Sequence, residues 1–294
     1  LIRWDKYKIY KIYMKNHLIR LFILLFIVTQ GLVAEEKLEP VEQDSVAGEE
    51  EKETFIKDLV EDYEETLGFF ITYRDPESNQ IFLKITEDQL KSEFIYFAHV
   101  LNGIASTGKV KGSYTDEGIF KIEKDFNKLR FSRILTNYYF DKDNPLAKSQ
   151  GANISDSTFQ VFDILANNED ENEYLIEITG MLLSEALTPI LPIYSPDGPP
   201  PGFNWGQLSP SKSRIKGVYN YEKNTDFEVE YVIESAPSYD YESEDVADPR
   251  NVNIKLRYSF IEMPKNDFEP RIANQSIGYF SERITDLTSL DVTP

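Results

Sequence analysis

Residues 93–105 read EFIYFAHVLNGIA, a strongly apolar run rich in β-branched and aromatic side chains. Such side chains are enriched in strands because they pack well on a pleated surface. We therefore expect this run to form a central strand of a sheet. Nearer the C-terminus, NVNIKLRYSFIEM (251–263) alternates polar and apolar residues and ends at Pro264. This alternation is typical of a strand with one buried face.

Shorter apolar runs occur in pairs, separated by polar or acidic turns, and each pair predicts two antiparallel strands. The pairs are FFITY (69–73) with IFLKI (81–85), IFKIEK (119–124) with LRFSRIL (129–135), TFQVFDILA (158–166) with EYLIEITGMLL (173–183), and RIKGVYNYE (214–222) with DFEVEYVIES (226–235). The sequence therefore predicts a mainly β fold with a few short helices (α+β), built as an antiparallel sandwich or a curved sheet.

Two segments have helical features. From Thr54, apolar residues recur at helical spacing up to Leu67, and Gly68 stands where a helix would be capped. These residues are Phe55, Ile56, Leu59, Val60, Tyr63 and Leu67. The second segment is ITEDQL (85–90), which predicts one helical turn with Thr86 as its N-cap.

The composition restricts the possible functions. The 294 residues include no cysteine, 18 Tyr and 19 Phe, and carry a net charge of −20. Without cysteine there is no disulfide, thiolate metal site or Cys nucleophile. The negative charge argues against nucleic acid as a partner, because phosphate binding needs a basic surface. The acidity favours a well-solvated surface, with binding of calcium or a cationic substrate as the alternative.

The first 53 residues resemble an export signal followed by a linker. MKNHLIRLFILLFIVTQGLVAEE begins at Met14, with a basic start, an apolar run and a small residue at Ala34, which is the layout of a secretory signal peptide. The run is shorter than the about 20 residues of a membrane span, so an uncleaved anchor is the weaker alternative. The predicted parts are residues upstream of the true start at Met14 (1–13), a signal peptide (14–34), an acidic disordered linker (35–53) and a β-rich accessory region (54–294). We expect an exported, periplasmic or extracellular protein without a stable membrane anchor.

The sequence provides no clear catalytic or metal site. Catalytic zinc usually needs three side-chain ligands, commonly including His, and the chain has only His17 and His99. His99 alternates with Phe97 and Leu101, which favours a hydrogen-bonded core histidine over a ligand. We therefore assign no catalytic, metal or cofactor-binding residue to this chain.

Carboxylates are more plentiful than histidines, but they do not indicate a particular site either. Glu177, Glu228 and Glu230 lie on predicted strands, and a paired-acid hydrolase could use such residues, yet nothing in their spacing selects a pair. The acidic loop 238–249 and the turn DKDNP (141–145) could hold calcium, although neither has the EF-hand spacing or its glycine. Solvated loops are the favoured interpretation for both.

One loop is unusual: YSPDGPPPGFNWGQLSPSKS, residues 194–213. Three consecutive prolines stiffen it, and Phe203 and Trp205 lie among glycines. The loop could pack against a neighbouring domain, or Trp205 could offer a stacking surface for a ligand such as a sugar. Docking against a neighbouring domain is the preferred alternative.

Several passages, taken in order, resemble the N-terminal region of a family of exported bacterial zinc-dependent metallopeptidases, a region that includes domain of unknown function 5117. The resemblance covers roughly Phe55 to Thr285. Its passages are the predicted helix that begins at Phe55, GFFITYRDPESNQIFLKITEDQL (68–90), NYYFDKDNPLAK (137–148), TFQVFDILA (158–166), EYLIEITGMLLSEA (173–186), SRIKGVYNYEKNTDFEVEYVIES (213–235) and EPRIANQSIGYFSE (269–282). No passage is highly specific by itself, but their order is.

This resemblance implies a non-catalytic accessory region that ends before a peptidase domain, with zinc expected only in that downstream domain. The chain alone would then be inactive, and its partner would be the peptidase domain of the same longer protein. Two other functions stay open from the sequence. One is a free-standing exported binding module that uses the loop with Phe203 and Trp205. The other is a hydrolase with paired carboxylates.

Overall fold

The fold is seen in a computed structural model that describes most of the chain after residue 54. The described residues are 55–105, 109–168, 170, 172–191, 205–235, 244–265, 276 and 283–288, and all of them belong to one compact unit, Lys52–Pro294. The upstream residues 1–13, the signal peptide 14–34 and the linker 35–53 lie outside the described residues, so these assignments stay predictions.

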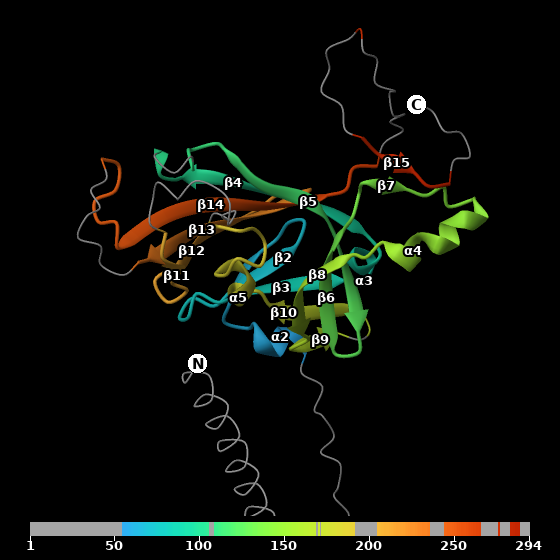
Figure 1. Cartoon of the computed structure of the whole chain (residues 1–294). Helices are drawn as coiled ribbons and strands as arrows, with labels where there is room; N and C mark the ends of the chain where they lie inside the picture. Colours follow the sequence, from blue (N-terminus) through green and yellow to red (C-terminus); the bar gives the residue numbers. More distant parts are fainter. Residues whose placement is uncertain are drawn as a thin grey trace, which may run out of the picture. The chain divides into compact units, whose positions relative to one another are not determined.

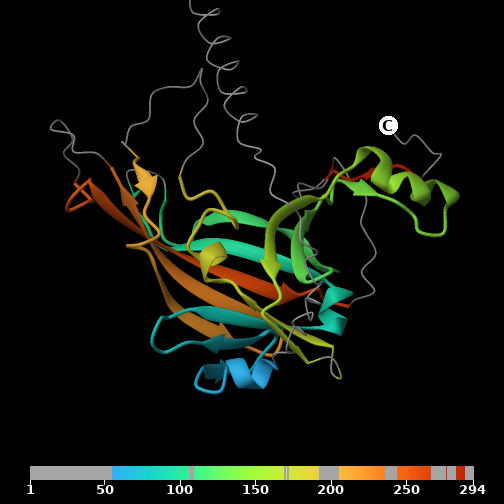
Figure 2. The ribbon, with the colours of Figure 1, turned by 90° about the horizontal axis from the view of Figure 1, so that it is seen from below.

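The larger of two main sheets has eight antiparallel strands in the order β11-β13-β14-β4-β5-β6-β8, with β12 also paired to β13. Its strands are β4 (Glu93–Asn102), β5 (Tyr114–Asp125), β6 (Lys128–Ile134), β8 (Ser157–Asp163), β11 (Gln207–Leu208), β12 (Arg214–Asn220), β13 (Asn224–Glu234) and β14 (Asn251–Glu262). The central position of β4 is confirmed. Figure 2 shows that this sheet is strongly curved.

The smaller sheet has five antiparallel strands in the order β1-β2-β3-β10-β9. They are β1 (Glu64–Thr66), β2 (Ile71–Arg74), β3 (Ile81–Thr86), β9 (Ala166–Asn168) and β10 (Glu173–Glu177). Strands make up 49% and helices 12% of the described residues. The predicted mainly β fold with a few short helices and a curved antiparallel sheet is therefore confirmed.

Aromatic side chains from both sheets form one shared core. Every second side chain of β4 is buried, because successive side chains of a strand point to opposite faces of the sheet. The ring of Phe70, just before β2, lies 5.3 Å from Phe94 of β4 and 6.2 Å from Phe260 of β14, measured between ring centroids. Edge-to-face and tilted pairs of this kind add to the stability that comes from burying their surface.

A buried hydrogen-bond chain fastens the connection after β10 to the larger sheet. The hydroxyl of Tyr231 donates to the carbonyl oxygen of Leu182 over 2.6 Å, and it lies 2.8 Å from the hydroxyl of Tyr258. Leu182 ends the helix α5 (Thr179–Leu182). Both tyrosine side chains are fully buried, so each hydroxyl needs such a partner to avoid a desolvation cost.

The helix predicted after residue 54 is wrong beyond its first turn. Helix α2 (Ile56–Leu59) is four residues long, and the chain then enters β1, which pairs with β2. Gly68 serves a close approach instead of a helix cap. A Cβ at this position would lie 2.5 Å from Cβ of Asn220, and the next residue, Phe69, donates its backbone N–H to the carbonyl of Tyr221. By contrast, the turn expected at 85–90 is confirmed as α3 (Glu87–Leu90) with Thr86 as N-cap.

The predicted hairpin of 158–166 with 173–183 is also wrong, because the first run divides between the two sheets. Its first part, β8, pairs with β6 in the larger sheet. Its last residue, Ala166, begins β9, and this short strand is the part that pairs with β10. The chain crosses between them at Leu165, whose N–H donates to the carbonyl of Leu175. Residues 179–182 form helix α5 instead of continuing the strand. The other three predicted pairs are confirmed.

The remaining elements lie apart from both main sheets (Figure 1). They are β7 (Tyr138–Tyr139), the 3-10 helix η2 (Pro145–Ser149), α4 (Gln150–Asn153) and β15 (Thr285–Asp286). Strands β7 and β15 pair in parallel as a separate two-stranded sheet. Among the helices that the structure describes, none has the length and apolar character needed to cross a membrane.

Candidate docking surface

His99 is half-buried on the face of β4 opposite the core, in register with Arg257 of β14. Its Nδ1 atom is enclosed and has no hydrogen-bond partner within the described residues. Burial lowers the pKa of His99, the positive charge of Arg257 lowers it further, and Asp226 opposes both. The expectation of a hydrogen-bonded core histidine is therefore wrong: the side chain lies on the face opposite the core, and its Nδ1 has no partner in the part of the chain that the structure describes.

The three glutamates considered for acid–base chemistry are not brought together as a catalytic pair. Glu228 and Glu230 lie on β13, but each faces its own cation: Glu228 lies 3.4 Å from Arg257, and Glu230 lies 2.6 Å from Arg214. Burial raises the pKa of Glu230, but Arg214 and Lys255 together bring it below its usual value.

Glu177 lies in the other sheet, where its Oε1 accepts the backbone N–H of Thr179 over 2.7 Å. Among the described residues, no group of three or more His, Cys, Asp or Glu side chains is placed to hold a metal ion. The geometry of these residues thus offers no support for a paired-acid hydrolase.

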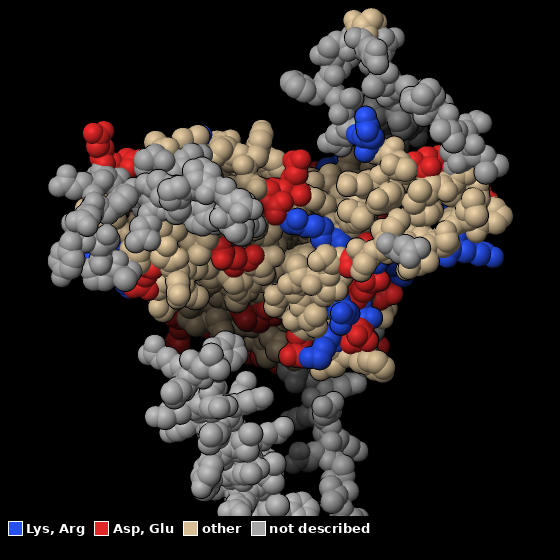
Figure 3. All heavy atoms as spheres, in the orientation of Figure 1, with Lys and Arg blue, Asp and Glu red and all other residues tan. Residues whose placement is uncertain are grey.

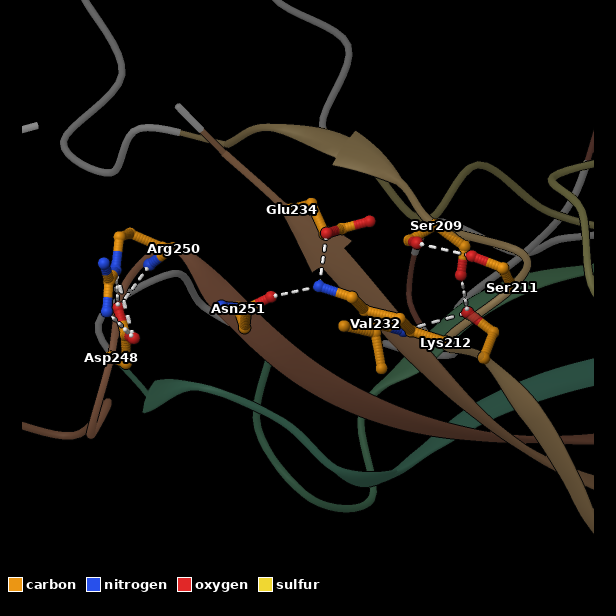
Figure 4. A network of polar contacts seen from close by, with 9 residues as sticks. Ser209, Ser211, Lys212, Val232, Glu234, Asp248, Arg250 and Asn251 are labelled. Atoms are coloured by element: carbon orange, nitrogen blue, oxygen red, sulfur yellow. Dashed lines mark hydrogen bonds and ion pairs between the residues drawn. The ribbon is translucent and has the colours of Figure 1, made fainter. Parts of the chain in front are cut away.

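The unusual loop is anchored where the structure describes it. Trp205 is half-buried and packs against the main core, while Phe203 lies outside the described residues. The adjoining residues 209–213 are fastened to the end of the larger sheet (Figure 4). Lys212 contacts Glu234 and donates to Oδ1 of Asn251 over 2.9 Å. Trp205 therefore acts as part of the packing, which weakens the reading of it as an exposed stacking surface.

The two acidic segments considered for calcium have structural roles in their described parts. Asp248, from the loop 238–249, makes a two-pronged ion pair with Arg250, and the hydrogen bonds from Arg250 lower the pKa of Asp248 to about 2. In the turn 141–145, the side chain of Asn144 accepts the N–H of Leu146 and so caps η2. Residues 238–243 lie outside the described residues.

The turn 141–145 belongs to a projecting feature that we call the arm, defined as residues 135–154 together with 283–288. Strand β15 joins β7 through backbone bonds from Thr285 N–H to the carbonyl of Asn137 (2.9 Å) and from Leu287 N–H to the carbonyl of Tyr139 (3.1 Å). The arm thus unites two segments that are distant in the sequence.

Thr288 closes this connection. Its buried hydroxyl oxygen accepts the N–H of Asp141 over 2.9 Å, and its carbonyl accepts from the side-chain amide of Asn144 over 3.1 Å. The same hydroxyl donates to Asp286 over 2.7 Å. Residues 283–288 are therefore held by both backbone and side-chain bonds.

The surface of the arm exposes several large apolar side chains and carries no net charge. Exposed fractions of its large apolar side chains range from 41% at Tyr138 to 59% at Ile284. The complete set is Leu135, Tyr138, Tyr139, Leu146, Ile284 and Leu287. Its acidic and basic residues balance, in a chain with a net charge of −20. Figure 3 shows the arm, at the right, as mostly uncharged.

A cavity of about 380 Å³ opens in the arm, lined by Tyr138, Phe140, Ser149, Ile154 and Leu287. A two-stranded sheet is marginally stable by itself in water, and contiguous exposed apolar surface marks sites of protein interaction. The arm therefore has the properties of a docking surface. Sequence reasoning missed it as a site, although the adjacent aromatic residues of NYYF (137–140) were a usable signal.

Comparison with known proteins gives one result for this chain. Neither the curated proteins nor the solved structures yield a match. One family model, "Domain of unknown function (DUF5117)", matches residues 112–290. That range begins just before β5 and includes both segments of the arm. Because the match covers more than half of the sequence, the chain belongs to the DUF5117 family.

Proposed function

We propose that this chain is a non-catalytic accessory region of an exported zinc-dependent metallopeptidase, and that its arm packs against the catalytic domain. The observation that carries the proposal is the set of exposed large apolar side chains on an arm without net charge, together with its open cavity. The buried centres of protein interfaces are depleted of charged residues and enriched in aromatic ones. Zinc and the catalytic residues would belong to the peptidase domain.

Two further points support this function. The passages quoted from residues 68 to 282 resemble the region that precedes the catalytic domain in such peptidases, and the chain belongs to the DUF5117 family. In addition, the arm joins residues 283–288 to residues 135–154. A domain that follows this chain would be joined to the arm through residues 289–294, so docking would need only a short connection.

The first test is the coding DNA beyond the codon for Pro294. An open frame that encodes H-E-x-x-H is the expected result, because two histidines at this spacing on one helix face bind zinc and the glutamate acts as general base. A stop codon within a few codons would contradict the proposal and leave a free-standing exported module.

A second test measures whether the arm is covered in the longer protein. Amide hydrogen exchange at residues 137–147 and 284–288 should be slower in the product of the whole open frame than in the isolated chain. The turn at Phe126, whose side chain is 93% exposed, serves as an internal control and should exchange equally in both. Equal exchange in the arm as well would show that the arm stays uncovered.

A further inference from the structure

A second surface, distinct from the arm, lies between the edge of the larger sheet and helix α5. Here β8 ends the order of strands, and a cavity of about 240 Å³ separates it from the turn between β10 and α5. The labels β8, α5 and β10 lie close together in Figure 1. We call this cavity and its rim the β8 groove.

The backbone of β8 offers free hydrogen-bonding groups to the groove. Strand β8 pairs with β6 so that Phe162 faces Leu129, and in the same register the N–H of Ile164 donates to the carbonyl of Asn127 over 3.0 Å. In an antiparallel ladder, successive residues point their backbone groups alternately toward and away from the partner strand. The N–H and C=O groups of Val161 and Asp163 therefore point away from β6.

Within the described residues, no strand pairs with this outward edge. A row of unpaired N–H and C=O groups is a template on which another extended chain can add as a strand. The edge is neither blocked by proline nor filled with lysine, two of the usual means by which sheets protect such edges. The register shift between Thr158 and Gln160 interrupts it at one end. At the other end the N–H of Leu165 is already bonded to the carbonyl of Leu175, so the groups open to an added strand are those of Val161 and Asp163.

The walls of the groove are apolar and partly exposed. Val161 is 37% and Leu165 42% exposed, while Phe162 and Met181 are buried beside them. Both exposed side chains line the cavity. This arrangement suits one apolar side chain of an added strand.

The charge of the groove is negative. Two carboxylates line the cavity, Asp163 and Glu177, and none of the described residues that line it is Lys or Arg. Asp163 is paired with Lys128 over 2.6 Å. Glu177 uses Oε1 to accept the N–H of Thr179, which leaves Oε2 without a partner within the described residues. Glu177 can therefore attract a basic side chain to the groove.

We propose that the β8 groove binds an extended peptide segment as an added strand, with one apolar side chain between Val161 and Leu165 and a basic side chain near Glu177. Main-chain bonds to Val161 and Asp163 would supply affinity, and the carboxylate would supply selectivity. This proposal does not depend on the peptidase assignment, because a binding module could use the same groove.

The test uses fluorescently labelled, N-acetylated and C-amidated seven-residue peptides of alternating Val and Thr with a central Lys, Gln or Glu. Binding to the full chain is measured by fluorescence anisotropy. We expect saturable binding, with the highest affinity for the Lys peptide, a lower affinity for the Gln peptide and the lowest for the Glu peptide. The variant Glu177→Gln keeps the acceptor for Thr179 but removes the charge. It should weaken binding of the Lys peptide about threefold to tenfold, to the level of the Gln peptide.

The backbone contact is tested by Val161→Pro, which removes an N–H that the sheet itself does not use and which an edge strand tolerates. It should weaken binding of all three peptides about tenfold or more. The control Val161→Thr keeps the N–H and should change binding less than about threefold. Unchanged binding to a Val161→Pro protein with an intact unfolding midpoint would overturn the proposal.

If Val161→Pro fails to fold, peptides N-methylated at alternate amides replace it. Methylation along one peptide edge should abolish binding and methylation along the other should not, because an added strand pairs through one edge only. Equal effects from the two methylated series, or no saturable binding by any peptide, would overturn the proposal.

Discussion

At the scale of single residues, His99 makes the stability of the protein depend on pH just below neutrality. Burial lowers its pKa below the ordinary value of 6.5, Arg257 adds to this effect, and Asp226 partly opposes it. The unfolded chain therefore binds the proton more readily than the folded chain as the pH falls. His99 consequently contributes a loss of stability that begins near pH 6.5 and is complete below its folded pKa.

The variant His99→Gln should remove this loss. Urea midpoints measured at pH 7.5 and pH 5.5 should fall less between the two values in the variant than in the wild type. His17 is present in both proteins, so its contribution cancels in the comparison. An identical decrease in the two proteins would show that His99 has the same pKa in the folded and unfolded states.

At the scale of elements, Gly68 controls how closely the smaller sheet approaches β12. A Cβ there would lie 2.5 Å from Cβ of Asn220, whose side-chain amide donates to the carbonyl of Thr66 over 2.8 Å. Gly68→Ala should therefore force the two segments apart and destabilise the protein by about 1–3 kcal/mol in urea unfolding.

The matched control for this prediction is Gly151→Ala in α4. A Cβ at Gly151 meets nothing within 4 Å, and alanine favours a helix over glycine by up to about 1 kcal/mol. This variant should be neutral or slightly more stable. A Gly68→Ala protein that unfolds within about 0.5 kcal/mol of the wild type would contradict the close approach.

A comparison of strands β4 and β14 with the segment after Thr54 shows where sequence reasoning succeeds and where it fails. Strand β4 was predictable because its run is strongly apolar and rich in aromatic and β-branched residues. Strand β14 was predictable because its alternation over more than ten residues fixes which face is buried. The helix predicted after Thr54 failed because its apolar spacing also fits a short helix followed by a strand. Only the pairing of β1 with β2 distinguishes the two, and pairing is a tertiary property.

The candidate site was less predictable than the fold. The arm depends on parallel pairing of Tyr138 with Thr285 and on the bonds that Thr288 makes to Asp141 and Asn144. Local patterns encode none of these contacts, because the two segments lie at distant points of the sequence. The resemblance did include NYYFDKDNPLAK, but it could not show that these aromatic residues are exposed.

At the scale of the whole molecule, a neutral apolar arm is attached to a chain of net charge −20. Exposed apolar surface favours self-association of the isolated chain, while the like charges of two copies oppose it. Salt screens the repulsion, with a Debye length of about 10 Å at 0.1 M. Self-association of the isolated chain should therefore increase with salt concentration, as measured by sedimentation velocity from about 0.02 to 0.5 M NaCl.

This association should depend on the arm and not on exposed apolar residues in general. The double variant Tyr139→Ser, Leu146→Ser removes two side chains that are 53% and 49% exposed, and it should stay monomeric over the same salt range. Phe126→Ser removes a side chain that is 93% exposed on a different turn and should associate as the wild type does. If Phe126→Ser abolished association and the double variant did not, the turn at Phe126 would be the surface responsible for self-association. This result would contradict the docking proposal. An apolar surface that binds a neighbouring domain should also promote contact between copies of the isolated chain, in which that surface is uncovered.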